Sequence, residues 1–342
     1  MPNVYKYPVS YREFCQRVRR HAPSDLLPVI SRLAAKFGEP GEWLQSPYKK
    51  LTPWALAEVA RVSLVFGNEY RREPVTEDDV IFCCAAHIAI TERDLQTGTI
   101  DGFLKFMLRL ANEQLPYQEP PLHEWARSIA IFEQTTTSRT LEVLTNNWAT
   151  ELLGCSIREY VGISFFAQAA ALNNAGMIDL AWLNQDNFAF VRRIIATETI
   201  RHVLERNFIA TPAQLRTLQP NLAAKQQSEM RRYLFNPLFS KPIINGMTDH
   251  LLVPAPGLLV RKSSQLGIYY SGTDHWGNRF ARDVGHLFES YVGRQLQLAH
   301  GASVYPAIKY EKDQCESVDW IVVFDEVVVL DFRTSDVSLD RQ

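Results

Sequence analysis

The 342-residue chain lacks a strong net charge and any long apolar run. Lys and Arg number 36 and Asp and Glu 38, which gives a formal charge of −2 at pH 7. A basic coat over the whole protein, of the type that holds nucleic acid, is therefore excluded, although a local basic patch is not. The longest uncharged stretch, residues 161–178, contains Gln168 and Asn173. It is too polar for a membrane span, which needs about 20 mainly apolar residues.

Cysteine is scarce and scattered. The five cysteines show no CxxC spacing; they are Cys15, Cys83, Cys84, Cys155 and Cys315. This pattern is typical of reduced thiols rather than of a disulfide framework. The N-terminal residues MPNVYKYPVSYREF contain no apolar segment of the secretory type. Both observations favour a cytoplasmic protein.

Several common catalytic motifs are missing. The sequence has no GxxxxGK[ST], no GxGxxG after a strand, no GxSxG and no paired Cys/His zinc signature. Nucleotide hydrolysis through a P-loop, dinucleotide redox chemistry and serine hydrolysis therefore have little support. Glu198 and His202, four residues apart, form the spacing of a two-ligand metal pair, but no second such pair accompanies them. We interpret them as neighbours on a helix surface.

Helical periodicity dominates the first two thirds of the chain. Hydrophobic residues make up 46% and charged residues 22%, as in globular proteins, and the length suggests about two domains. Apolar spacing and capping residues predict helices over 24–37, 52–64, 76–90, 101–112, 123–133, 138–153, 157–173, 187–207, 212–218 and 223–234. The stretch 236–267, with several prolines and glycines, predicts a packed irregular connection, and residues 271–278 (SGTDHWGN) are rich in turn formers. We therefore expect a helical domain over 1–240 and a second domain over 241–342.

The C-terminal part has a different pattern. An amphipathic helix is predicted over 278–298, followed by strands over 303–310, 317–324 and 327–332. Glu289 lies on the helix, Asp319 at the start of the second strand and Asp331 near the end of the third, with Arg333 two residues beyond on the same face. Carboxylates among such apolar residues are costly unless paired or bound to a cation. Two or three of them beside one cation make an oxygen site of the Mg²⁺ type.

The run GHLFESYV…VYPAIKYEKDQCESVDWIVVFDEVVVLDFRTS resembles the core of the PD-(D/E)XK nuclease superfamily. The resemblance covers residues 279–335 and assigns Glu289 to the helix acid, Asp319 to the strand acid, and Asp331 with Arg333 to the acidic-x-Lys triplet. It implies an α+β fold in which an αβββ nuclease-like segment follows a mostly helical region. It also implies Mg²⁺- or Mn²⁺-dependent hydrolysis of phosphodiester bonds, with DNA preferred to RNA as the partner. Such segments at the end of helical chains resemble parts of bacterial restriction and anti-phage defence systems.

Two departures from the family pattern keep an alternative open. The triplet reads Asp-Phe-Arg, and arginine neither deprotonates readily nor replaces a compact ammonium. Only nine residues follow Arg333, so the family core is truncated, completed by the N-terminal helices, or completed by another chain or copy. The alternative is a catalytically degenerate scaffold or subunit that binds nucleic acid or a protein. A third interpretation is a helical interaction protein whose C-terminal hairpin only completes the fold.

The register between the last two strands decides whether a metal site forms. If Asp325 and Glu326 make a two-residue turn, Asp319 faces away from Asp331; with a three-residue loop the two are directly opposed. Residues 281–342 carry 6 Lys and Arg against 11 Asp and Glu, a charge of −5. Binding of a polyanion there therefore needs basic residues from outside this segment. The Arg-Arg pairs beside Tyr70 and Tyr233 are candidates for this role, the alternative being solvated helix faces.

Overall fold

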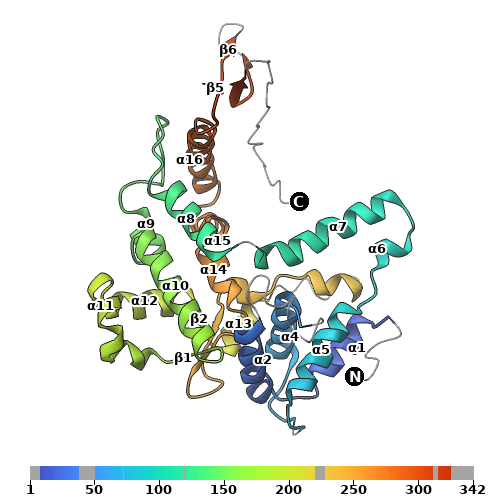
Figure 1. Ribbon diagram of the computed structural model, residues 1–342. Helices are drawn as coiled ribbons and strands as arrows, with labels where there is room; N and C mark the ends of the chain where they lie inside the picture. The colour runs from blue at the N-terminus through green and yellow to red at the C-terminus, as the bar shows by residue number, and fades with distance from the viewer. Residues whose placement is uncertain are drawn as a thin grey trace.

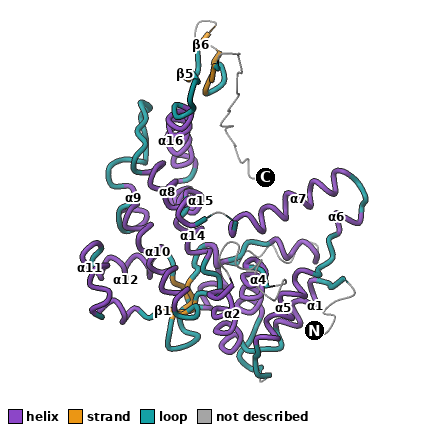
Figure 2. Tube along the Cα trace, viewed as in Figure 1, coloured by secondary structure: helices purple, strands orange, loops and turns teal. Residues whose placement is uncertain are grey.

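A computed structural model describes residues 8–37, 51–71, 73–118, 120–219, 228–310 and 315–324. The described chain is mainly helical with few and short strands, as the purple and orange segments of Figure 2 show, and the predicted α+β class is confirmed. None of the described helices combines the length and the apolarity that crossing a membrane requires.

The first helices form one side of the molecule (Figure 1). They are α1 (Tyr11–Val18), α2 (Pro23–Phe37), α4 (Pro53–Phe66), α5 (Glu77–Ile88), α6 (Arg93–Gln96), α7 (Ile100–Gln114) and the 3-10 turn η1 (Leu115–Tyr117). Local signals place their starts. The Thr52 hydroxyl accepts a hydrogen bond from the Ala55 N–H, and Thr76 with Asp79 forms a capping box.

The next helices and 3-10 turns are α8 (Pro121–Phe132), α9 (Trp148–Leu153), α10 (Ile157–Asn173), η2 (Leu180–Asn184), η3 (Asp186–Phe188), α11 (Ala189–Ile194), α12 (Thr197–Asn207), α13 (Pro212–Leu218), η5 (Ser228–Tyr233) and η6 (Pro237–Phe239). Helices α8 to α12 form the other side (Figure 1), whereas α13, η5 and η6 pack back against α1 and α4. The predicted helices 157–173 and 212–218 match α10 and α13 in both bounds.

A small sheet separates two hydrophobic cores. Its strand order is β1 (Met177–Ile178), β4 (Leu251–Leu252), β3 (Ile243–Ile244) and β2 (Ile209–Ala210), and only the β2–β3 pair is parallel. Ile244 and Leu252 pack into the core built on α1 to α5, whereas Ile243 and Val253 pack into the core built on α8 to α16. Since neighbouring strand residues point to opposite faces, the sheet contributes to both cores.

Residues 241–277 are more regular than the sequence predicted. They contain α14 (Gly257–Ser263) and α15 (Gln265–Trp276), so the expected irregular connection and the expected turns at 271–278 are wrong there. The glycines in this stretch allow close packing instead. A Cβ on Gly267 would overlap backbone atoms of Lys262, and one on Gly272 would overlap the Phe280 ring.

Two other helix predictions are wrong in part. Only Trp148–Leu153 of the predicted helix 138–153 is helical. The Asp283 carboxylate accepts hydrogen bonds from the backbone N–H groups of Glu142, Val143 and Leu144, which holds that stretch in an open loop. The predicted helix 187–207 is interrupted at Ile195, whose backbone is extended and whose side chain is buried.

The C-terminal helix and strands project from the second half of the molecule (Figure 1). Helix α16 (Asn278–Leu296) is followed by β5 (Ser303–Pro306), β6 (Lys309–Tyr310), β7 (Cys315–Glu316) and β8 (Trp320–Val323). β5 pairs with β8 and β6 with β7, both antiparallel. The helix predicted over 278–298 and strands within 303–310 and 317–324 are thus confirmed. The third predicted strand, 327–332, lies outside the described residues.

The expected division at residue 240 stays a prediction. Residues after 240 contribute to both cores, through Ile244 and Leu258 on one side and through Leu259 and Phe280 on the other.

Helix α7 presents an apolar stripe to solvent and stands apart from its neighbours in Figure 1. The exposed apolar residues of the stripe recur at three- or four-residue spacing; they are Ile100, Phe103, Leu104, Met107 and Leu108. Its inward side is polar, since Glu113 lies against Arg232 and His87.

Candidate active site at the end of helix α16

Helix α16 carries Glu289, the predicted helix acid, toward its C-terminal end. The helix is held by its apolar face, on which Phe280 and Leu287 are buried in the second core. Asp283 is also buried, at 1% exposed, and fastens α16 to the loop at 142–144. Since α16 is anchored both by its buried apolar face and by the hydrogen bonds of Asp283, it is a rigid support for Glu289.

Strand β8 is attached to α16 through Trp320. The indole Nε1 of Trp320 donates a hydrogen bond to the backbone carbonyl of Glu289 over 3.1 Å. The ring lies against Gly293, where a Cβ would overlap it. Gly293 sits one helical turn after Glu289, so the two contacts place the strand beside the predicted helix acid.

Asp319, the predicted strand acid, directly precedes Trp320 at a bend before β8. Asp319 is half-buried. The structure thus brings the chain positions of Glu289 and Asp319 to the same end of α16. Asp331 and Arg333 lie outside the described residues, so their contribution stays a prediction.

A cavity of about 540 Å³ opens at this end of α16. Glu289 and Trp320 line it, together with the loop at 134–139, the end of β5 and the C-terminal turn of α16. The loop supplies Thr135, Thr136, Thr137, Ser138 and Arg139, and α16 supplies Arg294. Guanidinium and hydroxyl groups donate hydrogen bonds to the oxygens of a phosphodiester. A carboxylate beside them is a ligand for a divalent cation.

The two arginines in the cavity are arranged differently. Arg294 Nη1 donates to the backbone carbonyl of Gln134 over 2.9 Å, which ties α16 to the loop. Arg139 is exposed at the rim. Arg139 lies about 150 residues before Glu289, and no local sequence signal links the two positions. The sequence therefore did not identify the loop as part of the site.

The divalent cation that the resemblance implies is matched only in part by the described residues. Within them, no three His, Cys, Asp or Glu side chains are grouped as metal ligands. Glu289 and Asp319 are two of the three predicted carboxylates, and the third, Asp331, lies outside that part of the chain. The Glu198 and His202 pair is exposed on α12 and has no further ligand among the described residues.

Arg232, one of the basic candidates, is used inside the protein. It is 8% exposed, and its guanidinium pairs with Glu92 at 2.6 Å and with Glu113 at 3.0 Å. Burial raises the pKa of Glu113, but the hydrogen bond to His87 and the charge of Arg232 together lower that pKa below its usual value. A phosphate would have to displace carboxylates to reach Arg232, so Arg232 does not supply a free basic group.

No protein-family model, no curated protein and no solved structure matches the chain. The nuclease resemblance therefore rests on the residues of the C-terminal segment alone.

Proposed function

We propose that the protein is a metal-dependent nuclease whose site lies at the C-terminal end of α16. The observation that supports the proposal is the hydrogen bond from Trp320 to the Glu289 carbonyl, because it sets the residue after Asp319 against the backbone of Glu289, at a cavity that Glu289 and Trp320 line. Asp319 and Asp331 hold a Mg²⁺ or Mn²⁺ ion and Glu289 assists them. The ion polarises the phosphodiester and lowers the pKa of an attacking water.

The basic residues of the cavity have a separate role in this proposal. Arg139 and Arg294 hold the phosphates next to the scissile bond and offset the acidic charge of the segment. Arg333 stabilises the charge that develops on the phosphate. DNA is the preferred substrate, and phage defence is the process that the resemblance suggests.

The experiment is a cleavage assay on plasmid DNA and on RNA with Mg²⁺ or Mn²⁺, repeated with EDTA. Cleavage by the full chain should be lost with EDTA and reduced at least about 100-fold in Glu289→Gln, Asp319→Asn and Asp331→Asn, because each change removes a metal-binding charge. Glu198→Gln, which alters an exposed acid on α12, is the matched control and should cleave at the original rate.

A second candidate function is a nuclease-like subunit that binds nucleic acid without cutting it. The Asp-Phe-Arg triplet favours it. In that case the natural chain binds DNA but does not cleave it with Mg²⁺ or Mn²⁺. Arg139→Gln then weakens DNA binding and makes the affinity less dependent on salt concentration. Cleavage that appears only after Asp331→Glu with Arg333→Lys would identify this second function. Absence of both cleavage and binding in all variants would exclude both candidates.

A further inference from the structure

A second cleft, separate from the cavity at Glu289, lies where the two halves of the molecule meet. A cavity of about 360 Å³ is lined by residues of α7, η1, α8, α10, α14 and α15. A neighbouring cavity of about 580 Å³ shares Asn112, Tyr117, Arg261 and Tyr270 with it. We call the two cavities together the Arg261 cleft. Cavities of about 300–1,000 Å³ are the size of small-molecule sites.

Two buried oxygens that line the cleft accept no hydrogen bond from the described residues. Glu124 is 6% exposed; its Oε1 lies 3.7 Å from Arg127, but its Oε2 accepts no hydrogen bond. The buried Oε1 of Gln265 has no donor either. Arg261 is half-buried and lines both cavities. Unpaired buried polar groups are costly, so a site that keeps them is suited to a ligand that pairs them.

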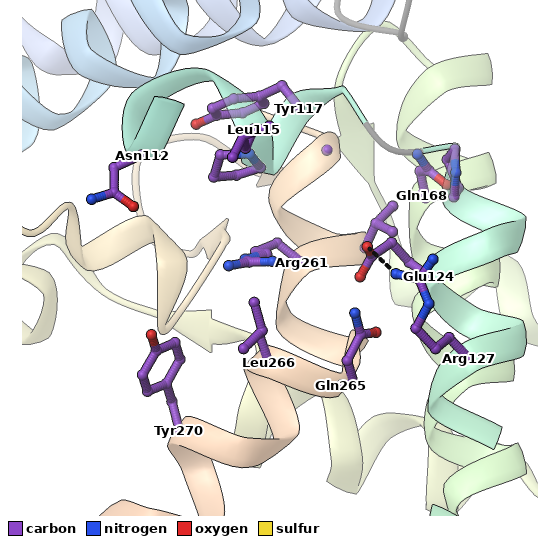
Figure 3. Close-up of a pocket in the computed structure, with 14 residues that line it drawn as sticks. Asn112, Leu115, Tyr117, Glu124, Arg127, Gln168, Arg261, Gln265, Leu266 and Tyr270 are labelled. Atoms are coloured by element: carbon purple, nitrogen blue, oxygen red, sulfur yellow. Dashed lines mark ion pairs between the residues drawn. The ribbon is translucent and has the colours of Figure 1, made fainter. Parts of the chain in front are cut away.

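The polar groups are sorted by type along the cleft (Figure 3). The Glu124 carboxylate and the Gln265 amide lie on one side, whereas the Arg261 guanidinium extends toward the side of Asn112 and Tyr270. A matching ligand has hydrogen-bond donors at one end and a negative charge at the other.

The larger cavity beyond Arg261 is lined by charges of both signs. Lys262 and Arg109 line it beside the carboxylates of Glu58, Glu113 and Asp274, and Glu113 is paired with Arg232. The Lys262 ammonium donates to the Ser271 hydroxyl over 3.0 Å, while burial and the nearby Lys241 lower the pKa of Lys262 to about 8. An anionic group placed there would favour the charged ammonium. The anionic end of the ligand therefore belongs on this side.

Aromatic side chains in the cleft favour a planar ring. Tyr117 and Tyr270 line the same cavity as the unpaired oxygens. Guanine carries N–H donors at N1 and N2, side by side on its Watson–Crick edge, and could offer them to the two unpaired oxygens. Adenine lacks the N1 donor. We propose that the Arg261 cleft binds a guanine nucleotide, with the base at Glu124 and Gln265 and the phosphate at Arg261 and Lys262.

This site goes beyond the proposed nuclease function, since the Arg261 cleft shares no lining residue with the cavity at Glu289. Its test measures binding and not cleavage, so a failure of either proposal leaves the other intact. The nucleotide could arrive free or as a guanosine within a single strand. Titration with a short single-stranded oligonucleotide containing one guanine, beside the same strand without it, distinguishes the two sources.

The experiment is calorimetric titration of the full chain with GMP, IMP, AMP and guanosine. GMP should bind, and each of the other three should bind at least about tenfold more weakly. IMP lacks the N2 amino group, AMP presents the wrong base edge, and guanosine lacks the phosphate. This series uses the unaltered protein, so its outcome does not depend on whether a variant folds.

Two variants then assign the ends of the ligand. Glu124→Gln and Arg261→Gln should each weaken GMP binding at least about tenfold. The matched controls are Glu133→Gln and Arg158→Gln, which alter an exposed ion pair elsewhere and should leave the affinity unchanged. No binding of GMP at millimolar concentration, equal binding of GMP and AMP, or unchanged affinity in both cleft variants would overturn the proposal.

Discussion

The backbone of Gly293 lies directly against the indole ring of Trp320, with no room for a side chain between α16 and β8. The same indole donates to the Glu289 carbonyl, so ring packing and hydrogen bonding act on one side chain. The attachment of β8 to α16 therefore depends on a glycine one turn after the predicted helix acid.

Gly293→Ala should release β8 from α16, because the methyl group would overlap the Trp320 ring. Overpacking of this kind costs about 1–3 kcal/mol. Hydrogen exchange of the amides in 303–306 and 320–323 should become at least about tenfold faster. Gly285→Ala is the matched control on the same helix, since a Cβ there meets no atom within 4 Å. It should leave exchange unchanged, and equal acceleration in both variants would contradict the role of Gly293.

The sequence predicted elements well where their signals are local. Thr52 and Thr76 cap α4 and α5, and α10 and α13 begin at capping boxes, so their starts could be placed from a few residues. Predictions were wrong where distant residues decide. The loop at 142–144 is held by Asp283, about 140 residues away, and no local pattern contains that contact.

The candidate site divides in the same way. Glu289 lies on α16, as apolar periodicity predicted, whereas Asp319, predicted inside the strand 317–324, lies at a bend just before β8. Arg139 enters the cavity through a loop from the first half of the chain, and the Arg261 cleft joins α7 to α14 and α15. Such long-range arrangements depend on packing, which periodicity does not encode.

Asp283→Asn should destabilise the protein strongly. The Asp283 carboxylate accepts from three backbone N–H groups, with the shortest distance, 2.7 Å, to Val143 N. An amide keeps the shape but loses the charge and one acceptor, so we expect a loss of about 2–4 kcal/mol in the free energy of unfolding. Denaturant titration measures it. Asp101→Asn, at an exposed pair with Lys105, is the control and should change that free energy by less than about 0.5 kcal/mol.

The Glu58–Arg61 pair lies in the first core and should show strong coupling. Arg61 is fully buried; its Nε donates to Glu58 Oε2 over 2.6 Å and its Nη2 to the Tyr11 hydroxyl over 2.8 Å. Arg61→Met leaves the Glu58 carboxylate buried without its charge partner, at a cost of about 3–5 kcal/mol. Adding Glu58→Leu should restore part of that loss. Additive effects in a double-mutant cycle would show that the two charges are independent.

Lys262 should make stability depend on pH. Burial, then the charge of Lys241, lower its pKa from the ordinary 10.5 to about 8 in the folded protein. Between about pH 8 and pH 10.5 the unfolded chain binds more protons at this lysine, so its contribution to stability rises with pH across that window. Below pH 8 the lysine is charged in both states and the full cost of burying it is present.

Lys262→Met should therefore stabilise the protein at pH 7, on the order of 1–3 kcal/mol, because it removes that cost. The gain should shrink as the pH rises from 8 to 10, where the natural lysine loses its proton in the folded state. Thermal unfolding of both proteins across this range measures the difference. Lys105→Met removes an ammonium from an exposed position beside Asp101 and should change stability by less than about 0.5 kcal/mol. A Lys262→Met gain that is constant from pH 7 to pH 10 would show that the ammonium is not the cause.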